Sequence, residues 1–342
     1  MRYNRWFKDN NFLTPTEYTQ QLSEYVEGLR YEDLPPEVAD KAKKILLNTA
    51  GAIFASKNSD IYKKTLEIAK EANGGEGGTT TDWNSGTKLA AVNAALVLGT
   101  CADVRSEEDC MQTGHPSAAV IPCAWLAAEE RHKSGKELIT AIVAAYEVYY
   151  RIAMSVKPSE EQVAKRGWGE MSWQIFAAII PIAKLYDLDA RRINQAMGIG
   201  CECSTVPTSY AAVTHSDFQH YEYGYRARDG FLITKSAEKG IHNQRDLFDD
   251  PRAYAEGMVG HAADTEWLTK ELGKHYYIMD AGLRTRSGKP EADVSFDELA
   301  ELFLAQTAEI VSAGKAKEIV AGISTIEAVN DVSKLTELLF AD

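Results

Sequence analysis

Four stretches of this 342-residue chain would be apolar on nearly every side if they formed helices. They cover residues 90–98, 117–132, 137–152 and 172–186, and alanine is frequent in all of them. A helix that is apolar on every side packs among other helices at the centre of a domain. Alternation of apolar and polar residues, which is typical of strands, is scarce, and its best candidate is the short segment 274–279. The sequence therefore predicts an all-α fold, a multi-helix globular bundle, and not a doubly wound sheet.

The other helices and the breaks between them follow from periodicity and from turn-forming residues. Apolar or small residues recur at steps of three and four from Val38 to Ile53, and Pro35 and Pro36 stand just ahead, as helix-start residues do. Residues 191–200 and the chain from Phe296 continue the helical pattern. We expect loops where polar or glycine-rich segments interrupt it, at 73–79, 104–114, 156–169, 206–230 and 281–294.

The charge balance excludes several classes of partner. The chain has 37 Lys and Arg residues against 50 Asp and Glu residues, a formal net charge of −13, whereas proteins that bind nucleic acids or anionic membranes present cationic surfaces. The longest apolar stretch, 175–183, contains Pro181 and is too short to cross a bilayer. The polar and aromatic N-terminus lacks the apolar core of a signal peptide. We therefore expect a soluble, cytoplasmic protein with no nucleic-acid or membrane partner.

The sequence carries none of the usual cofactor signatures. Neither a GxGxxG nor a GxxxxGK[ST] loop occurs. The acidic cluster 107–109 is interpreted as a solvated loop, because its spacing is not that of an EF-hand; calcium binding is the alternative. No CxxC pair occurs among the cysteines, and we expect all of them to be reduced thiols. The five cysteines are Cys101, Cys110, Cys123, Cys201 and Cys203.

The sharpest candidate for chemistry is the segment Gly114-His115-Pro116-Ser117, which ends a polar loop and begins an apolar helix. Proline is common in the first turn of a helix, so Pro116 places His115 close to the N-cap. The positive end of the helix favours the neutral imidazole, which can act as a base near neutral pH. The alternative is that His115 is only a capping or loop residue.

Further segments could line a pocket. Residues 214–230 combine tyrosines, histidines and arginines, a composition that suits either a carboxylate-binding wall or an exposed interface loop. Glycines around Trp168 would let the backbone approach a ligand, or would form an ordinary turn. Lys274 stands beside tyrosines and would pair with a carboxylate if partly buried; otherwise it is a surface lysine. Cysteine–histidine catalysis by Cys101 and His115 is less favoured, because buried cysteine is the common case.

Several motifs, in this order along the chain, match one known family. They are LPPEVA at 34–39, LLNTAG at 46–51, NAA at 93–95, HPS at 115–117, AAE at 127–129, SGKEL at 134–138 and NQA at 194–196. Together they resemble the MmgE/PrpD family, which includes 2-methylcitrate dehydratase, cis-aconitate decarboxylase and an iminodisuccinate epimerase. The similarity spans roughly residues 34–277 and resumes near 295–338.

The resemblance implies a helical domain that holds an active-site cleft, which a smaller α/β lid domain closes in the family. It also implies action on small di- and tricarboxylates, with neither a metal nor an organic cofactor, by proton movement next to a carboxylate. The lid would lie between about residues 277 and 295, where this chain has only a linker. We therefore expect an N-terminal extension (1–30), a helical domain (31–280), a linker in place of the missing lid (281–294) and C-terminal helices that pack back on the helical domain (295–342).

Some positions depart from the family pattern. Asn48 stands where the family has an aspartate, and the segment CADVR at 101–105 stands where the family has an Asp-rich run. The family's second histidine falls on Gly169 and one of its lysines on Gln219, while another lysine survives as Lys274. These replacements argue against 2-methylcitrate dehydratase itself.

Two hypotheses follow. In the first, the chain is a cofactor-independent lyase or isomerase (a dehydratase, decarboxylase or epimerase) acting on a small carboxylate-bearing organic acid or biosynthetic intermediate, with a homodimer covering the open cleft. In the second, it is a non-catalytic binding or assembly protein that kept the helical core. For the enzyme, the predicted catalytic residues are His115, Asp103 and Lys274, and the predicted substrate-binding residues are Arg105, Ser117, Trp168, Gln219 and His220.

Overall fold

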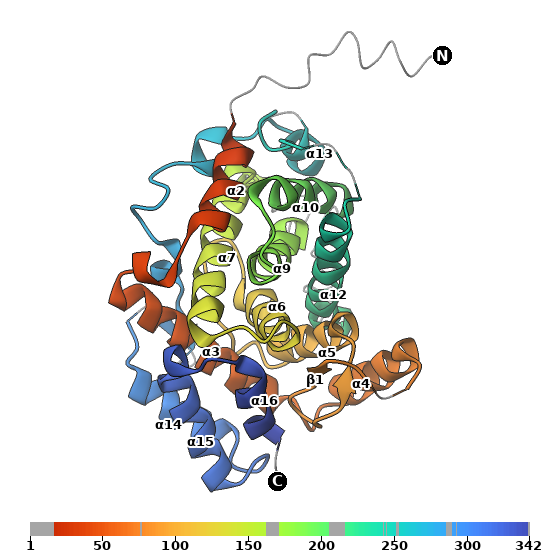
Figure 1. Ribbon diagram of the computed structural model, residues 1–342, viewed down its shortest axis with the longest axis vertical. Coiled ribbons are helices and arrows are strands. Elements are labelled where there is room, and N and C mark those ends of the chain that lie inside the picture. Colours follow the sequence, from red (N-terminus) through yellow and green to blue (C-terminus); the bar gives the residue numbers. More distant parts are fainter. Residues whose placement is uncertain are drawn as a thin grey trace.

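The computed structural model describes residues 17–75, 77–161, 171–204, 216–241, 243, 245–250, 253–284, 289–291 and 293–340. Within these ranges the chain is mostly helical, and its strands form two short antiparallel pairs (Figure 1). The prediction of an all-α bundle is confirmed. No helix in the described ranges is long and apolar enough to cross a membrane.

The helices are α2 (Tyr18–Gly28), α3 (Pro36–Ala55), α4 (Asp60–Asn73), α5 (Ala91–Asp103), α6 (Ser117–Glu130), α7 (Gly135–Ser155), α9 (Met171–Leu185), α10 (Ala190–Cys203), α12 (Phe218–Glu238), α13 (Tyr254–Val259), α14 (Phe296–Gln306), α15 (Ala313–Ser324) and α16 (Val332–Phe340). Short 3-10 helices are η1 (Tyr31–Asp33), η2 (Thr265–Leu268), η3 (Tyr277–Asp280) and η4 (Ile326–Ala328). Strand β1 (Thr80–Thr81) pairs with β2 (Lys88–Leu89), and β3 (Leu283–Arg284) pairs with β4 (Pro290–Glu291).

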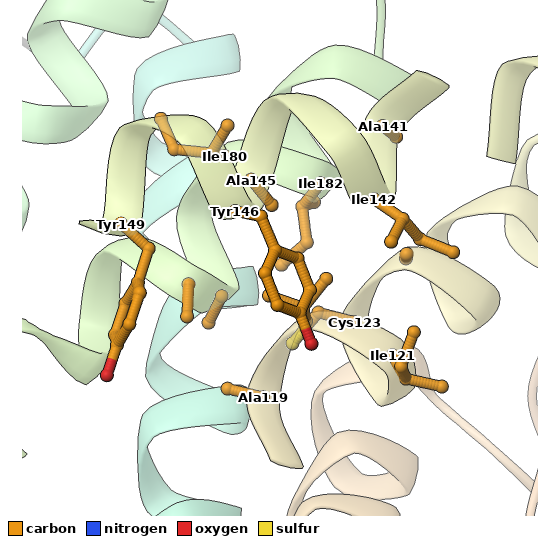
Figure 2. Close-up of a cluster of buried hydrophobic side chains, with 14 of the residues drawn as sticks. Ala119, Ile121, Cys123, Ala141, Ile142, Ala145, Tyr146, Tyr149, Ile180 and Ile182 are labelled. Atoms are coloured by element: carbon orange, nitrogen blue, oxygen red, sulfur yellow. The ribbon is translucent and has the colours of Figure 1, made fainter. Parts of the chain in front are cut away.

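Helices α6 and α9 form the centre of the bundle, as their all-round apolar sequences predict. Every α6 residue from Ser117 to Glu129 is buried, and so is every α9 residue except Lys184. Figure 1 places both in the middle of the molecule, with α7 on one side and α5 and α12 on the other. Side chains from α6, α7 and α9 share one apolar cluster, in which Ile121, Ala145 and Ile182 are labelled (Figure 2).

The C-terminal helices pack against the same core. The Phe303 ring of α14 meets the Phe54 ring of α3 edge-on, with ring centroids 6.1 Å apart. The Trp125 indole of α6 donates a hydrogen bond to the Thr336 hydroxyl of α16 at 2.9 Å. The segment 281–294, which we expected to be a linker, contains β3 and β4.

Two local predictions are wrong. The segment 274–279 contains no strand; it leads into η3, because the Tyr277 N–H donates to the buried Glu147 carboxylate and the Tyr277 ring stacks on Tyr150 at 4.3 Å. The expected loop at 206–230 becomes α12 from Phe218 onward. This helix packs through small residues, so it lacks the apolar periodicity that would reveal it; a Cβ on Gly230, for example, would lie only 2.5 Å from the Ala178 Cβ.

Candidate functional site

Two glycines bring the end of α5 close to the start of α12. A Cβ on Gly224 of α12 would lie 2.2 Å from Thr100 Oγ1 and 2.3 Å from Leu96 O. A Cβ on Gly99 of α5 would lie 2.9 Å from the Ala227 Cβ. Real side chains essentially never approach this closely, so only glycine permits the crossing.

Asp103 and His220 meet one helical turn beyond this crossing. Asp103 follows Gly99 by four residues and His220 precedes Gly224 by four, so both lie on the faces that touch. The His220 Nδ1 lies 2.5 Å from Asp103 Oδ2. A carboxylate only accepts hydrogen bonds, so Nδ1 carries a hydrogen and Nε2 is the nitrogen that titrates. This hydrogen bond raises the pKa of His220, with burial acting in the opposite direction.

The loop between α5 and α6 is held from several sides. Cys110 and Gly282 exchange backbone hydrogen bonds of 2.8 and 2.9 Å. The carbonyl oxygen of Thr113 accepts from the Tyr149 hydroxyl of α7 at 2.7 Å and from the Trp173 indole of α9 at 2.9 Å. These bonds fix the backbone that leads to His115.

Asp109 organises the end of this loop. Its Oδ1 accepts from the Ser117 N–H at 3.0 Å, and its Oδ2 accepts from the Tyr146 hydroxyl at 2.7 Å. Figure 2 shows the Tyr146 side chain pointing from α7 toward α6. The Asp109 carbonyl oxygen lies 2.6 Å from His115 Nδ1. Since a carbonyl oxygen only accepts, we infer that neutral His115 carries its hydrogen on Nδ1 and keeps Nε2 as its basic nitrogen.

Glu108 lies beside both His115 and Asp103. Its Oε1 is 3.2 Å from His115 Nδ1, and its side chain is fully buried. Burial, followed by the neighbouring Asp103 carboxylate, raises the pKa of Glu108 well above its ordinary value, which favours the neutral carboxyl. The sequence-based interpretation of residues 107–109 as a solvated loop is therefore wrong: Glu108 and Asp109 are both buried.

The structure brings together only part of the predicted set. His115, Asp103 and His220 join through Glu108, and Ser117 is buried at the start of α6. Gln219 is half-buried in the first turn of α12, next to His220.

The other predicted residues lie apart or outside the described ranges. Arg105 is exposed, and its guanidinium pairs with Glu107 of its own loop at 2.9 and 3.0 Å. Lys274 is exposed on a turn ahead of η3 and is not partly buried; no described contact joins its side chain to His115 or Asp103. Trp168 lies outside the described residues.

The cysteine alternative has little support from the geometry. All five cysteines are free. Cys101 is fully buried, and burial raises the pKa of its thiol, so the nucleophilic thiolate is scarce. Its described side-chain contacts include the Asn84 amide at 3.9 Å and no bond to His115. Among the described residues, no group of three or more His, Cys, Asp or Glu side chains is arranged to hold a metal ion.

Three participants escaped the sequence reasoning: Glu108, Asp109 and Tyr146. Only Tyr146 could have been noticed in the sequence, because a tyrosine in the middle of an apolar helix needs a buried hydrogen-bond partner for its hydroxyl. The pairing of Glu108 with Asp103 depends on how the loop folds back, which no local pattern reports.

A cavity of about 520 Å³ lies elsewhere and shares no residue with this site. It lies where η1, the start of α7 and the end of α9 meet. Its lining residues are Glu27, Leu29, Arg30, Tyr31, Glu32, Ser134, Lys136, Glu137, Thr140, Lys184, Leu185, Asp187 and Leu188.

Known proteins share this sequence pattern. The chain is 21% identical to cis-aconitate decarboxylase from Mus musculus over 268 residues, which are 77% of this chain and 53% of that protein. It is 22% identical to the Homo sapiens enzyme of the same name over 280 residues (78% and 57%), and 21% identical to that of Aspergillus terreus over 242 residues (68% and 48%). The chain thus spans about half the length of the curated relatives it matches. Residues 20–266, well over half of the chain, match the model of the MmgE/PrpD N-terminal domain, and the chain belongs to the MmgE/PrpD family.

Proposed function

We propose that this chain carries a cofactor-independent proton-transfer site for a small carboxylate-bearing molecule, in a lyase or isomerase. One observation supports this most directly. His115 is fixed through Nδ1 by the Asp109 carbonyl, which leaves Nε2 free to act as a base, and its side chain is 25% exposed. The relatives named cis-aconitate decarboxylase favour an organic acid as substrate and a lyase as the reaction class.

The chemistry requires a base beside the carbon that carries the acidic proton, and groups that stabilise the negative charge formed when that proton leaves. Nε2 of His115 would remove the proton from the carbon beside a carboxylate, and an enediolate would form. From this intermediate, a neighbouring hydroxyl can leave as water, or a proton can be added from the other face. In an unsaturated acid, a proton added at a different carbon shifts the double bond, and CO₂ is then lost as a proton takes its place on carbon. Burial raises the pKa of Glu108, which favours the neutral form of this carboxyl beside His115.

Deuterium incorporation tests this proposal. The protein would be incubated in D₂O with cis-aconitate, citrate and other di- and tricarboxylates, and ¹H NMR would follow exchange and product formation. The His115→Gln variant should lose at least 100-fold in rate, since a general base contributes about 10²–10⁴. The matched control is His132→Gln, because His132 is an exposed histidine that also pairs with an aspartate, Asp331, at 3.2 Å. Equal rates in wild type and His115→Gln would refute the catalytic assignment.

The proposed homodimer rests on one exposed face of α12. Phe218, Tyr221, Tyr225 and Leu232 recur at helical spacing, and the Phe218 and Leu232 side chains are about half exposed. The guanidinium of Arg228 lies 4.2 Å from the Tyr225 ring centroid. Exposed aromatic residues with arginine are typical of protein interfaces.

Light scattering of the purified chain tests the dimer. The double variant Phe218→Ser with Leu232→Ser should convert a dimer to a monomer, while Ile68→Ser, an exposed apolar residue on α4, serves as the control. This face also supports the second candidate function, a non-catalytic assembly protein. That candidate would be favoured if the wild type forms the dimer but exchanges no deuterium with any carboxylate.

A further inference from the structure

We propose that His220 is the second acid–base group of this site, the proton donor that works with the base His115, and that the buried carboxyl pair Asp103–Glu108 positions the two imidazoles through their Nδ1 atoms. This inference rests on the proposed function and assigns the proton donor that it requires.

The geometry leaves His220 available to a ligand. Its Nδ1 is held by Asp103 at 2.5 Å, and its side chain is 24% exposed, which leaves Nε2 as the second nitrogen of the ring. The close crossing at Gly99 and Gly224 fixes the two helices that carry the pair. A histidine that is anchored at one nitrogen by a buried carboxylate and open at the other is suited to deliver a proton.

The two histidines have different partners at Nδ1. His220 faces the Asp103 carboxylate directly, which stabilises the imidazolium. His115 Nδ1 faces the Asp109 backbone carbonyl at 2.6 Å and Glu108 Oε1 at 3.2 Å. The titratable groups that act on this cluster are Asp103 from α5, Glu108, Asp109 and His115 from the loop, Tyr146 from α7, Lys41 from α3, and Asp217 and His220 from the start of α12.

Glu108 links the two histidine sites. It is fully buried, with Oε1 3.2 Å from His115 Nδ1 and with the Asp103 carboxyl as a neighbour. A buried carboxyl is costly in its charged form, and burial together with Asp103 raises the pKa of Glu108. Asp103 is paired with His220, and Asp109 is bonded to Tyr146 and Ser117.

The proposed step balances as follows for the loss of water. Nε2 of His115 takes the proton from the carbon beside the substrate carboxylate, and the C–H electron pair moves into the enediolate. The carbon–oxygen bond of the neighbouring hydroxyl then breaks as the C=C bond forms, and Nε2–H of His220 protonates the departing oxygen to give water. For epimerisation, Nε2–H of His220 instead donates its own proton to the carbon from the opposite face. His115 ends protonated and His220 neutral, and exchange with solvent restores both.

The first experiment needs no substrate. In protein labelled at histidine, NMR would follow the Hε1 resonance of His220 against pH in wild type and in Asp103→Asn. Because the Asp103 hydrogen bond raises the pKa of His220, the Asn variant should titrate at lower pH. The matched control is the exposed pair His132–Asp331, where Asp331→Asn should leave the His220 titration unchanged. An unchanged His220 titration in Asp103→Asn would overturn the inference even if no substrate is found.

The second experiment uses the deuterium-exchange assay. His220→Gln should lose at least 100-fold in rate, and Asp103→Asn should move the high-pH limb of the rate profile to lower pH, because the donor loses its proton earlier. The control His132→Gln, at an exposed histidine outside the site, should retain the wild-type rate. If His115→Gln is inactive while His220→Gln keeps the wild-type rate, this inference is wrong and the proposed function stands. If His115→Gln is as active as wild type, the proposed function itself fails.

Discussion

Replacing Gly224 with alanine tests whether the crossing of α5 and α12 holds the site together. The new Cβ would lie 2.2 Å from Thr100 Oγ1 and 2.3 Å from Leu96 O. The Thr100 hydroxyl is itself bonded to Leu96 O at 2.8 Å, and a backbone carbonyl cannot move without its helix. Ordinary contact therefore requires the two helices to separate by about 1 Å, in an interior packed as densely as an organic crystal.

Two opposing effects decide the magnitude. Alanine in a helix interior is more favourable than glycine by about 1 kcal/mol. Overpacking of a core costs about 1–3 kcal/mol, and this contact involves backbone that has no alternative rotamer, which places it at the upper end. The free energy of unfolding should thus fall by about 1–2 kcal/mol. Gly314 of α15 has no heavy atom within 4 Å of the position its Cβ would occupy, so Gly314→Ala, the control, should keep or raise the stability.

Urea unfolding followed by tryptophan fluorescence measures both variants. Separation of α5 from α12 also pulls His220 away from Asp103, so the pKa of His220 should fall in Gly224→Ala and stay unchanged in Gly314→Ala. The reasoning would be refuted if Gly224→Ala were as stable as Gly314→Ala, or if it lost stability without any change in the His220 titration.

Three further substitutions probe the scaffold. Burial raises the pKa of Glu147 to about 7 from 4.5, so the folded state binds this proton more tightly than the unfolded chain does. The free energy of unfolding should therefore fall by about 3 kcal/mol between pH 4.5 and 7. Urea titrations at several pH values should show a smaller fall in Glu147→Gln, and an identical fall would contradict the assignment. Tyr146→Phe leaves the buried Asp109 carboxylate without one donor and should cost about 1–3 kcal/mol by urea unfolding, whereas an unchanged midpoint would mean that the bond contributes nothing. Ser295→Ala removes the N-cap of α14, where Ser295 accepts from the Glu298 N–H at 3.2 Å, and should cost about 1 kcal/mol, measured by the same method, unless water replaces the cap fully.

The sequence predicts the central helices well because their signal is local. Helices α6 and α9 are apolar on every side, and this pattern has no stable place except a helical core. Helix α12 escapes the same reasoning. Its sequence is polar enough to resemble a loop. Its contacts with α5 depend on glycine and alanine, which allow the two helix backbones to approach closely. In a sequence, glycine usually indicates a flexible segment, whereas in α12 it permits close helix packing.

In the candidate site too, local features could be predicted from the sequence and tertiary ones could not. The position of His115 could be predicted, because Pro116 and the apolar helix that follows place it just before the start of α6. The pairing of Asp103 with His220 joins residues 117 positions apart, and it depends on where two helices cross. Burial of Glu108 is also a tertiary property, since three consecutive acidic residues are most often solvated.

The formal charge of the chain is a poor guide to the electrostatics of this site. A net charge of −13 counts every carboxyl group as ionised, and on that count a loop with three consecutive acids would reject an anionic ligand. Burial changes this count within the loop, because it raises the pKa of both Glu108 and Asp109. The Glu107 carboxylate accepts hydrogen bonds from the Arg105 guanidinium and from the Gln306 amide. Burial thus favours the neutral forms of the Glu108 and Asp109 carboxyls, and the Asp103 hydrogen bond favours the charged form of His220. Both effects reduce the repulsion that an anionic substrate would meet at this site.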